Sequence, residues 1–209
     1  MKPRVFLSVL ALAFLVSGCT SALRVSPTLP SASAVTGSPS RVGVYIPPGR
    51  EYDLKPGSGI WPGTTYVFSP EETVQEGLAV LTKRHFKNAG LAENAGDKRW
   101  DYVLEYQCEQ PVVRAGGLDS RAPLRFVLRD PDTGRELQPI TLTGEGAEQG
   151  GRFFRIFFGR LAEKRALERS LEEAYSNLFV SVDGNLARTA ASLTQSAPER
   201  TYRPGRRTR

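Results

Sequence analysis

Few side chains in this sequence could do acid–base chemistry. The single histidine, His85, falls inside an expected helix, and no nucleophile motif accompanies it. Nucleophilic catalysis needs a base placed against a nucleophile, so we expect His85 to be a surface or boundary side chain. Sugar hydrolysis needs only two carboxylates, for which the candidates are Glu105, Glu109, Glu145 and Glu148. Surface carboxylates are common, so the sequence favours a protein that is not an enzyme.

Metal and phosphate chemistry is not indicated either. Zinc sites need several His or Cys ligands, which this sequence lacks. Asp130, Asp132 and Gly134 begin like a calcium loop, but the sixth and twelfth positions hold Arg135 and Thr141 in place of Gly and Glu. We expect a turn there. A glycine set before the last helix resembles a mobile connection more than a phosphate loop: Gly144, Gly146, Gly150 and Gly151. No metal and no dissociable cofactor is expected.

The first 18 residues have the pattern of an export signal. Lys2 and Arg4 precede an apolar run of about a dozen residues, and Ser17-Gly18 lead into Cys19. The run is shorter than the roughly 20 residues that a membrane-spanning helix needs. This segment resembles the lipobox of bacterial lipoproteins. The resemblance implies cleavage before Cys19, a diacylglycerol on its sulfur and an acyl chain such as palmitate on its amino group.

The same resemblance implies an address. In Gram-negative lipoproteins the second mature residue directs sorting, and Thr20 is not the aspartate that commonly retains a protein at the inner membrane. The expected location is the outer membrane, with the body facing the periplasm. The lipid at Cys19 would be the only covalently bound group, and outer-membrane lipid the first partner.

The formal net charge of +6 lies at the two ends of the chain. Lys2 and Arg4 leave with the signal, and the body without the C-terminal arginines holds as many acidic as basic residues. A nucleic-acid binder is expected to be basic, so no nucleic-acid partner is expected. Residues 190–209 are predicted to be a basic, disordered tail. It either solubilises the chain or contacts lipopolysaccharide or peptidoglycan through Arg203, Arg206, Arg207 and Arg209.

Cys108 is the second cysteine, and export places it in an oxidising compartment. The favoured interpretation is a small buried side chain in or near a strand. An intermolecular disulfide is the alternative.

The chain divides into a signal, a tether, a body and a tail. Residues 19–40 are rich in Ser, Thr, Pro and Ala, which predicts a lipidated flexible tether. Residues 41–189 are expected to form a single domain. Strands are predicted at 41–46, 65–68, 101–107, 111–114, 124–128 and 137–143, the last two as a hairpin with Pro139 at a sheet edge.

Two helices are predicted. The first begins with Ser69 as N-cap in a capping box and stops at Asn88-Ala89-Gly90. Its core face holds Val74, Leu78 and Leu81, with Phe86 closing the core side. The second runs from about 161 to 186, with a stripe of Leu167, Leu171, Ala174, Leu178 and Val182. The order of elements predicts an α+β fold, a mostly antiparallel sheet with two helices on one face. At this level the chain looks like the small α/β lipoproteins of Gram-negative envelope transport and assembly.

An aromatic and basic run precedes the second helix. As a short helix it would lie at a membrane or partner interface; otherwise it leads into the core with its arginines directed outward. Its residues are Arg152, Phe153, Phe154, Arg155, Phe157 and Phe158.

These observations favour a non-enzymatic accessory or binding component of the envelope with a protein partner. The alternatives from other classes are a hydrolase of cell-wall glycan or lipid, and a peptidoglycan-binding module.

Overall fold

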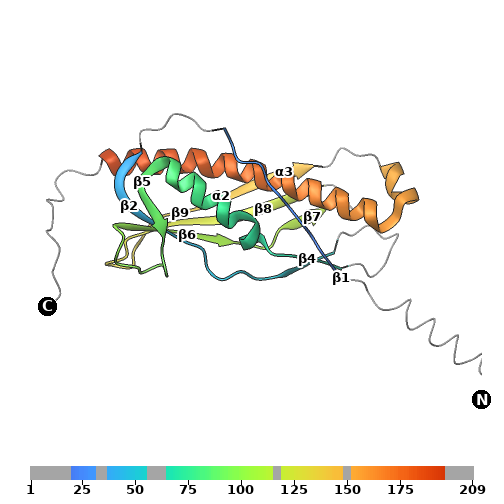
Figure 1. The fold of residues 1–209 in the computed structure, drawn as a ribbon, viewed down its shortest axis with the longest axis horizontal. Coiled ribbons are helices and arrows are strands. Elements are labelled where there is room, and N and C mark those ends of the chain that lie inside the picture. Colours follow the sequence, from blue (N-terminus) through green and yellow to red (C-terminus); the bar gives the residue numbers. More distant parts are fainter. Residues whose placement is uncertain (1–19, 32–36, 56–64, 115–118, 148–151, 196–209) are drawn as a thin grey trace, which may run out of the picture.

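The computed structural model describes residues 20–31, 37–55, 65–114, 119–147 and 152–195, with side chains from 161 onward in the last range. Its elements, in chain order, are β1 Thr20–Ala22, β2 Ser38–Tyr45, β3 Tyr52–Leu54, β4 Thr65–Phe68, α2 Pro70–His85, β5 Phe86–Leu91, β6 Tyr102–Cys108, β7 Val112–Arg114, β8 Asp119–Arg129, β9 Glu136–Ala147 and α3 Arg152–Gln195. Both helices lie on one face of the larger sheet (Figure 1). The predicted α+β class is confirmed.

The sheets are mixed rather than purely antiparallel, and antiparallel pairings are the more frequent. In the larger sheet, β2 pairs in parallel with both β5 and β6, whereas β8 pairs antiparallel with β6, β7 and β9. In the smaller sheet, β4 pairs in parallel with β1 and antiparallel with β3. The chain between β2 and β5 passes through β3, β4 and α2, which supplies the long crossover connection that a parallel pair of strands requires.

The helix α2 begins and packs as predicted but ends earlier. Pro70 is its first residue, acidic residues occupy the first turn, and Val74, Leu78 and Leu81 are fully buried. Ser69 is the N-cap residue, but its side chain makes no capping hydrogen bond. The helix stops at His85, and Phe86 is already extended and buried. The predicted stop at 88–90 is wrong, because those residues belong to β5.

The helix α3 is much longer than predicted. Its core stripe of Leu167, Leu171, Ala174, Leu178 and Val182 is buried, as the spacing of the apolar residues indicated. The sequence at 183–185 does not end the helix, which continues to Gln195. The stripe continues through Leu186, Ala190 and Leu193, so residues 190–195 belong to the packed helix and not to the predicted disordered tail of 190–209.

The hairpin of β8 and β9 is confirmed. The Asp130 side chain accepts the amide hydrogens of Asp132 and Thr133, and Gly134 has a φ of 70°, which favours glycine. The turn interpretation of this acidic segment therefore holds. Pro139 lies on β9, which pairs only with β8 in the described chain, so it sits on an edge strand as predicted.

Gly144 and Gly146 are not part of a mobile connection. Both are buried in β9 directly beneath α3. At the same edge, the Asn177 side chain donates to the Glu145 carbonyl oxygen at 2.7 Å, and Glu173 accepts the Ala147 amide hydrogen at 2.9 Å. Side chains of α3 thus satisfy backbone groups at this end of the β9 edge.

Residues 20–31 are not a free tether, which corrects the prediction for this part of 19–40. Thr20 to Ala22 pair with β4, and Leu23 is buried, with its amide donating to the Val67 carbonyl at 3.0 Å. Further along, the Thr28 amide donates to Ser176 on α3, and Arg84 on α2 donates to the Pro30 carbonyl. Composition suggested a tether because this segment buries little of its own surface and relies on backbone hydrogen bonds to other elements.

Candidate functional site

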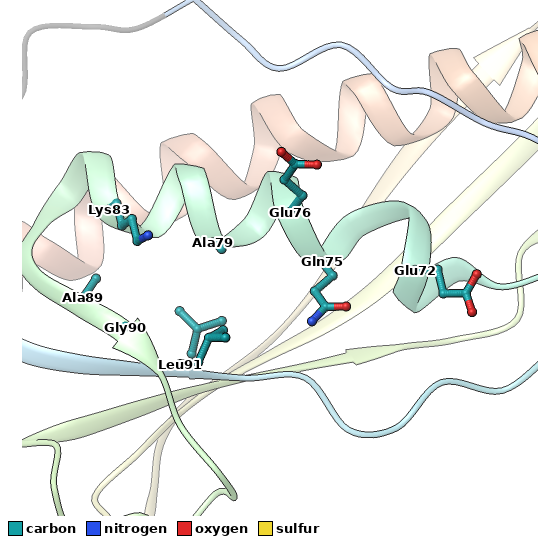
Figure 2. Close-up of a pocket in the computed structure, with 9 residues that line it drawn as sticks. Glu72, Gln75, Glu76, Ala79, Lys83, Ala89, Gly90 and Leu91 are labelled. Carbon is teal, nitrogen blue, oxygen red and sulfur yellow. The ribbon is translucent and has the colours of Figure 1, made fainter.

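An open groove lies between α2 and the edge strand β5 (Figure 2). Its volume is about 330 Å³. One wall is a face of α2, and the other is β5. The buried side chain of Val44 from β2 also lines the groove. The lining residues are Val44, Glu72, Gln75, Glu76, Ala79, Lys83, Ala89, Gly90 and Leu91.

The α2 wall of this groove is a second helix face, separate from the core face. Apart from the adjacent Gln75 and Glu76, its residues follow one another in steps of three or four, which places them on one side of the helix. Acidic and amide groups, Glu72, Gln75 and Glu76, occupy the N-terminal half, and Lys83 closes the C-terminal half. Ala79, between them, leaves the middle of the wall low and uncharged. Figure 2 shows the Gln75 and Leu91 side chains on the groove side.

The β5 wall offers backbone hydrogen-bonding groups. The Ala92 amide donates to the Val44 carbonyl at 2.9 Å, so alternate residues of β5 face β2. By the alternation of a strand, Ala89 and Leu91 direct their N–H and C=O groups away from the sheet. Leu91 is 64% exposed, the largest fraction among the exposed large apolar residues of the described chain. An unpaired strand edge of this kind is a template for a further strand.

Trp100 supports the groove from the opposite face of the sheet. A Cβ at Gly43 or Gly90 would lie within 2.7 Å of its indole ring, so the ring rests directly on both glycines. The loop before Trp100 is held by Asp97, whose carboxylate accepts from the Glu93 and Arg99 amides and from the Arg99 guanidinium. The Arg99 hydrogen bond lowers the pKa of Asp97 well below its usual range. The strand that carries the open edge is therefore backed by an ordered loop.

His85 is buried, which corrects the prediction of a surface or boundary side chain. It is 1% exposed, and its Nε2 lies 2.8 Å from the Asp183 carboxylate on α3. It ends α2 on the core side, where the contact with Asp183 joins the two helices. Among the described residues, no serine or cysteine forms a hydrogen bond with this imidazole.

The structure describes three of the four candidate carboxylates, and two of these are held in ion pairs with arginines. Glu105 is 6% exposed and bonds the Arg129 guanidinium at 2.6 Å. Glu145 is exposed and pairs with Arg121 at 2.9 Å. Glu109 is exposed, and Glu148 lies outside the described residues. The two ion pairs, Glu105 with Arg129 and Glu145 with Arg121, lie on the sheet face away from the helices. Both carboxylates are therefore bound to arginines.

Cys108 lies at the end of β6, half-buried, and packs against the core. Burial raises the pKa of its thiol to about 12, so the thiol stays protonated at neutral pH. It forms no disulfide with another described residue, and its burial agrees with the predicted small side chain in or near a strand. Within the described ranges, no group of three or more His, Cys, Asp or Glu side chains could hold a metal ion.

The remaining predicted site residues are not tested by the fold. Cys19 and the arginine tail, with Arg203, Arg206, Arg207 and Arg209, lie outside the described residues. Residues 152–160 form the first turns of α3, continuous with the rest of the helix. None of the helices in the described ranges is both long enough and apolar enough to cross a bilayer.

Sequence reasoning missed the groove. Its α2 wall reads as an ordinary solvated helix face, and β5 carries Lys87, Asn88 and Gly90, which are poor strand formers. No local pattern could have located it, because the residues of β5 do not alternate between buried and exposed, and the strand is recognised only from its pairing with β2.

Known structures resemble this fold. A Xanthomonas campestris protein of the DUF330 family superposes with a TM-score of 0.53 at 13% identity, over 85% of this chain and 100% of that chain. A Caulobacter crescentus protein whose description proposes a lipoprotein gives 0.40 at 12% identity, over 73% and 91%. Uncharacterized lipoprotein B from Nitrosomonas europaea gives 0.36 at 15% identity, over 80% and 92%. No protein-family model and no curated protein matches the sequence. At this identity, the Xanthomonas likeness establishes a shared fold.

Proposed function

We propose that this protein is a lipid-anchored, non-enzymatic accessory protein of a Gram-negative envelope, attached to the outer membrane through Cys19 and facing the periplasm. The observation that carries the proposal is the run Ser17-Gly18-Cys19 after a short apolar stretch. The lipoprotein descriptions of two structural neighbours agree with it.

The groove between α2 and β5 is the surface that we assign to the protein partner. Its outward backbone groups at Ala89 and Leu91 can bond an extended segment as an added strand, and the exposed Leu91 gives that segment an apolar contact. The charges of the α2 wall, negative at Glu72 and Glu76 and positive at Lys83, would orient the segment. The assigned partner is therefore a polypeptide that binds in extended form.

The anchor is tested by mass spectrometry of the N-terminal peptide of the membrane-extracted protein. We expect a peptide that begins at Cys19 and carries the mass of a diacylglycerol with a third acyl chain. Since Cys19→Ser removes the sulfur that accepts the lipid, this variant should appear only as the unprocessed chain. An acyl-free Cys19 in the native protein would refute the anchor.

The partner surface is tested by in-cell photocrosslinking from position 91. A photoreactive residue in place of Leu91 is expected to yield one discrete adduct with an envelope protein. The control places the same residue at Leu137, which is 43% exposed on the opposite edge strand β9. Adducts of equal yield from both positions, or from Leu137 alone, would remove the groove from the proposal and leave the anchor in place.

A further inference from the structure

We infer that the end of the molecule where β1 and α3 begin lies directly against the bilayer surface. This inference rests on the proposed anchor at Cys19. It differs from a simple lipid anchor because it assigns a protein surface to membrane contact and fixes the direction in which the body points.

The first step is the lack of slack after the anchor. Thr20, the residue next to Cys19, is already paired with Thr65. Successive Cα atoms lie about 3.8 Å apart, so a lipid on Cys19 would be separated from the packed strand by a single residue step. A flexible tether of 20 residues would have let the body move away from the membrane. Because β1 is paired with β4 from Thr20 onward, the body is held close to the lipid.

The second step connects β1 to the beginning of α3. Ser21 pairs with Tyr66, whose hydroxyl donates to the Glu163 carboxylate of α3 at 3.2 Å. Glu163 is only 4% exposed. The Arg24 amide donates to Glu168 one turn later at 3.0 Å. Figure 1 shows β1 and the first turns of α3 at the same end of the molecule, away from the end of α3.

The third step is the chemical character of that end. Leu161, in α3 two residues before Glu163, is 60% exposed. Arg24 and Arg165 are also exposed there. The preceding turns, residues 152–160, contribute a sequence of four phenylalanines and three arginines. An exposed leucine among exposed arginines, in a helix whose preceding sequence is rich in phenylalanine and arginine, suits a position at a bilayer interface.

The same geometry directs the groove away from the membrane. The segment after β1 runs along the helices until the Pro30 carbonyl accepts from Arg84, at the end of α2. Val180, further along α3, lies roughly 28 Å from Leu161 along the helix axis, from a rise of about 1.5 Å per residue. With its first turns on the bilayer, α3 would extend the body into the periplasm and leave the β5 edge accessible.

The test compares two exposed positions on the same helix. Leu161→Cys and Val180→Cys are made in the full chain, processed and acylated in cells, labelled with an environment-sensitive fluorophore and reconstituted into vesicles of phosphatidylethanolamine and phosphatidylglycerol. Val180 is a matched control because it is 57% exposed. Cys108 stays in place, since its raised pKa of about 12 makes the thiol slow to react, and the labelled parent protein measures any background.

We expect quenching by nitroxide-labelled lipid to be at least about threefold stronger at position 161 than at 180, with the reverse order for aqueous iodide, because interfacial residues sit several ångströms below the headgroups. Equal, water-like quenching at both positions in protein shown by mass spectrometry to be acylated overturns the inference and leaves the anchor standing. A protein without acyl groups overturns both.

Discussion

Replacing Gly144 with alanine is expected to lower the free energy of unfolding by about 3 kcal/mol or more, at the upper end of the cost of overpacking. A Cβ at this position would lie 2.6 Å from the Leu178 amide nitrogen and closer still to the Ala174 carbonyl oxygen. Both obstacles are backbone atoms of α3, so no side-chain rotation relieves the clash. Gly146→Ala should behave alike, since its Cβ would meet the Ala174 amide nitrogen at 2.5 Å.

The expected loss of stability comes partly from hydrogen bonds between α3 and the sheet. Moving α3 outward to admit a methyl group would lengthen the hydrogen bond from the Ser170 hydroxyl to Ser120, now 2.6 Å, and the one from Asn177 to the Glu145 carbonyl. Urea denaturation of the purified chain measures the change. The control is Gly184→Ala, inside α3 with no atom within 4 Å of its added Cβ, which should gain up to about 1 kcal/mol from helix propensity. Equal stability of the three variants would show that β9 and α3 are not in close backbone contact.

Replacing Arg129 with methionine is expected to cost about 3 kcal/mol, because it leaves a buried carboxylate without its cation. Glu105 is 6% exposed and would keep only the Gln107 side-chain amide, 2.6 Å away, as a donor. The Arg129 guanidinium also bonds Glu136 at 2.9 Å, so the substitution opens a three-residue network. The Glu105 hydrogen bond raises the pKa of Arg129, so the guanidinium keeps its charge.

Two further variants separate a charge effect from a packing effect. The double variant Arg129→Met with Glu105→Met should recover most of the loss, since the unpaired charge is gone. Arg121→Met breaks the neighbouring pair with Glu145, whose side chains are 48% and 66% exposed, and should change stability by less than about 1 kcal/mol. Chemical denaturation of all variants at one pH gives the comparison. A double variant as unstable as Arg129→Met would contradict the charge explanation.

Local patterns were sufficient for much of the fold. The step of three and four residues between apolar positions located the core faces of both helices, because a helix repeats every 3.6 residues wherever it lies. The turn at 130–134 was equally local, since it depends on one aspartate side chain and one glycine. The α+β class followed from the order of these elements.

Pairings between distant segments were decided by the tertiary structure alone. Phe86 to Leu91 became a strand because β2 lies beside it and supplies its hydrogen bonds, which outweighs a weak intrinsic propensity. His85 became buried because Asp183, 98 residues away, compensates its polar ring. Gly144 and Gly146 looked mobile in sequence, and only the approach of the α3 backbone explains why glycine is needed there.

The proposed anchor was visible in the sequence, whereas the two proposed contact surfaces were visible only in the structure. The predicted export signal and the anchor proposed at Cys19 come from the sequence alone, because export signals are read from a linear stretch of chain before any folding occurs. The tertiary structure decided that the segment after Cys19 is packed and that the edge of β5 is open. Both depend on hydrogen bonds between residues far apart in the chain, such as Leu23 with Val67 and Val44 with Ala92, whose partners a linear pattern does not specify.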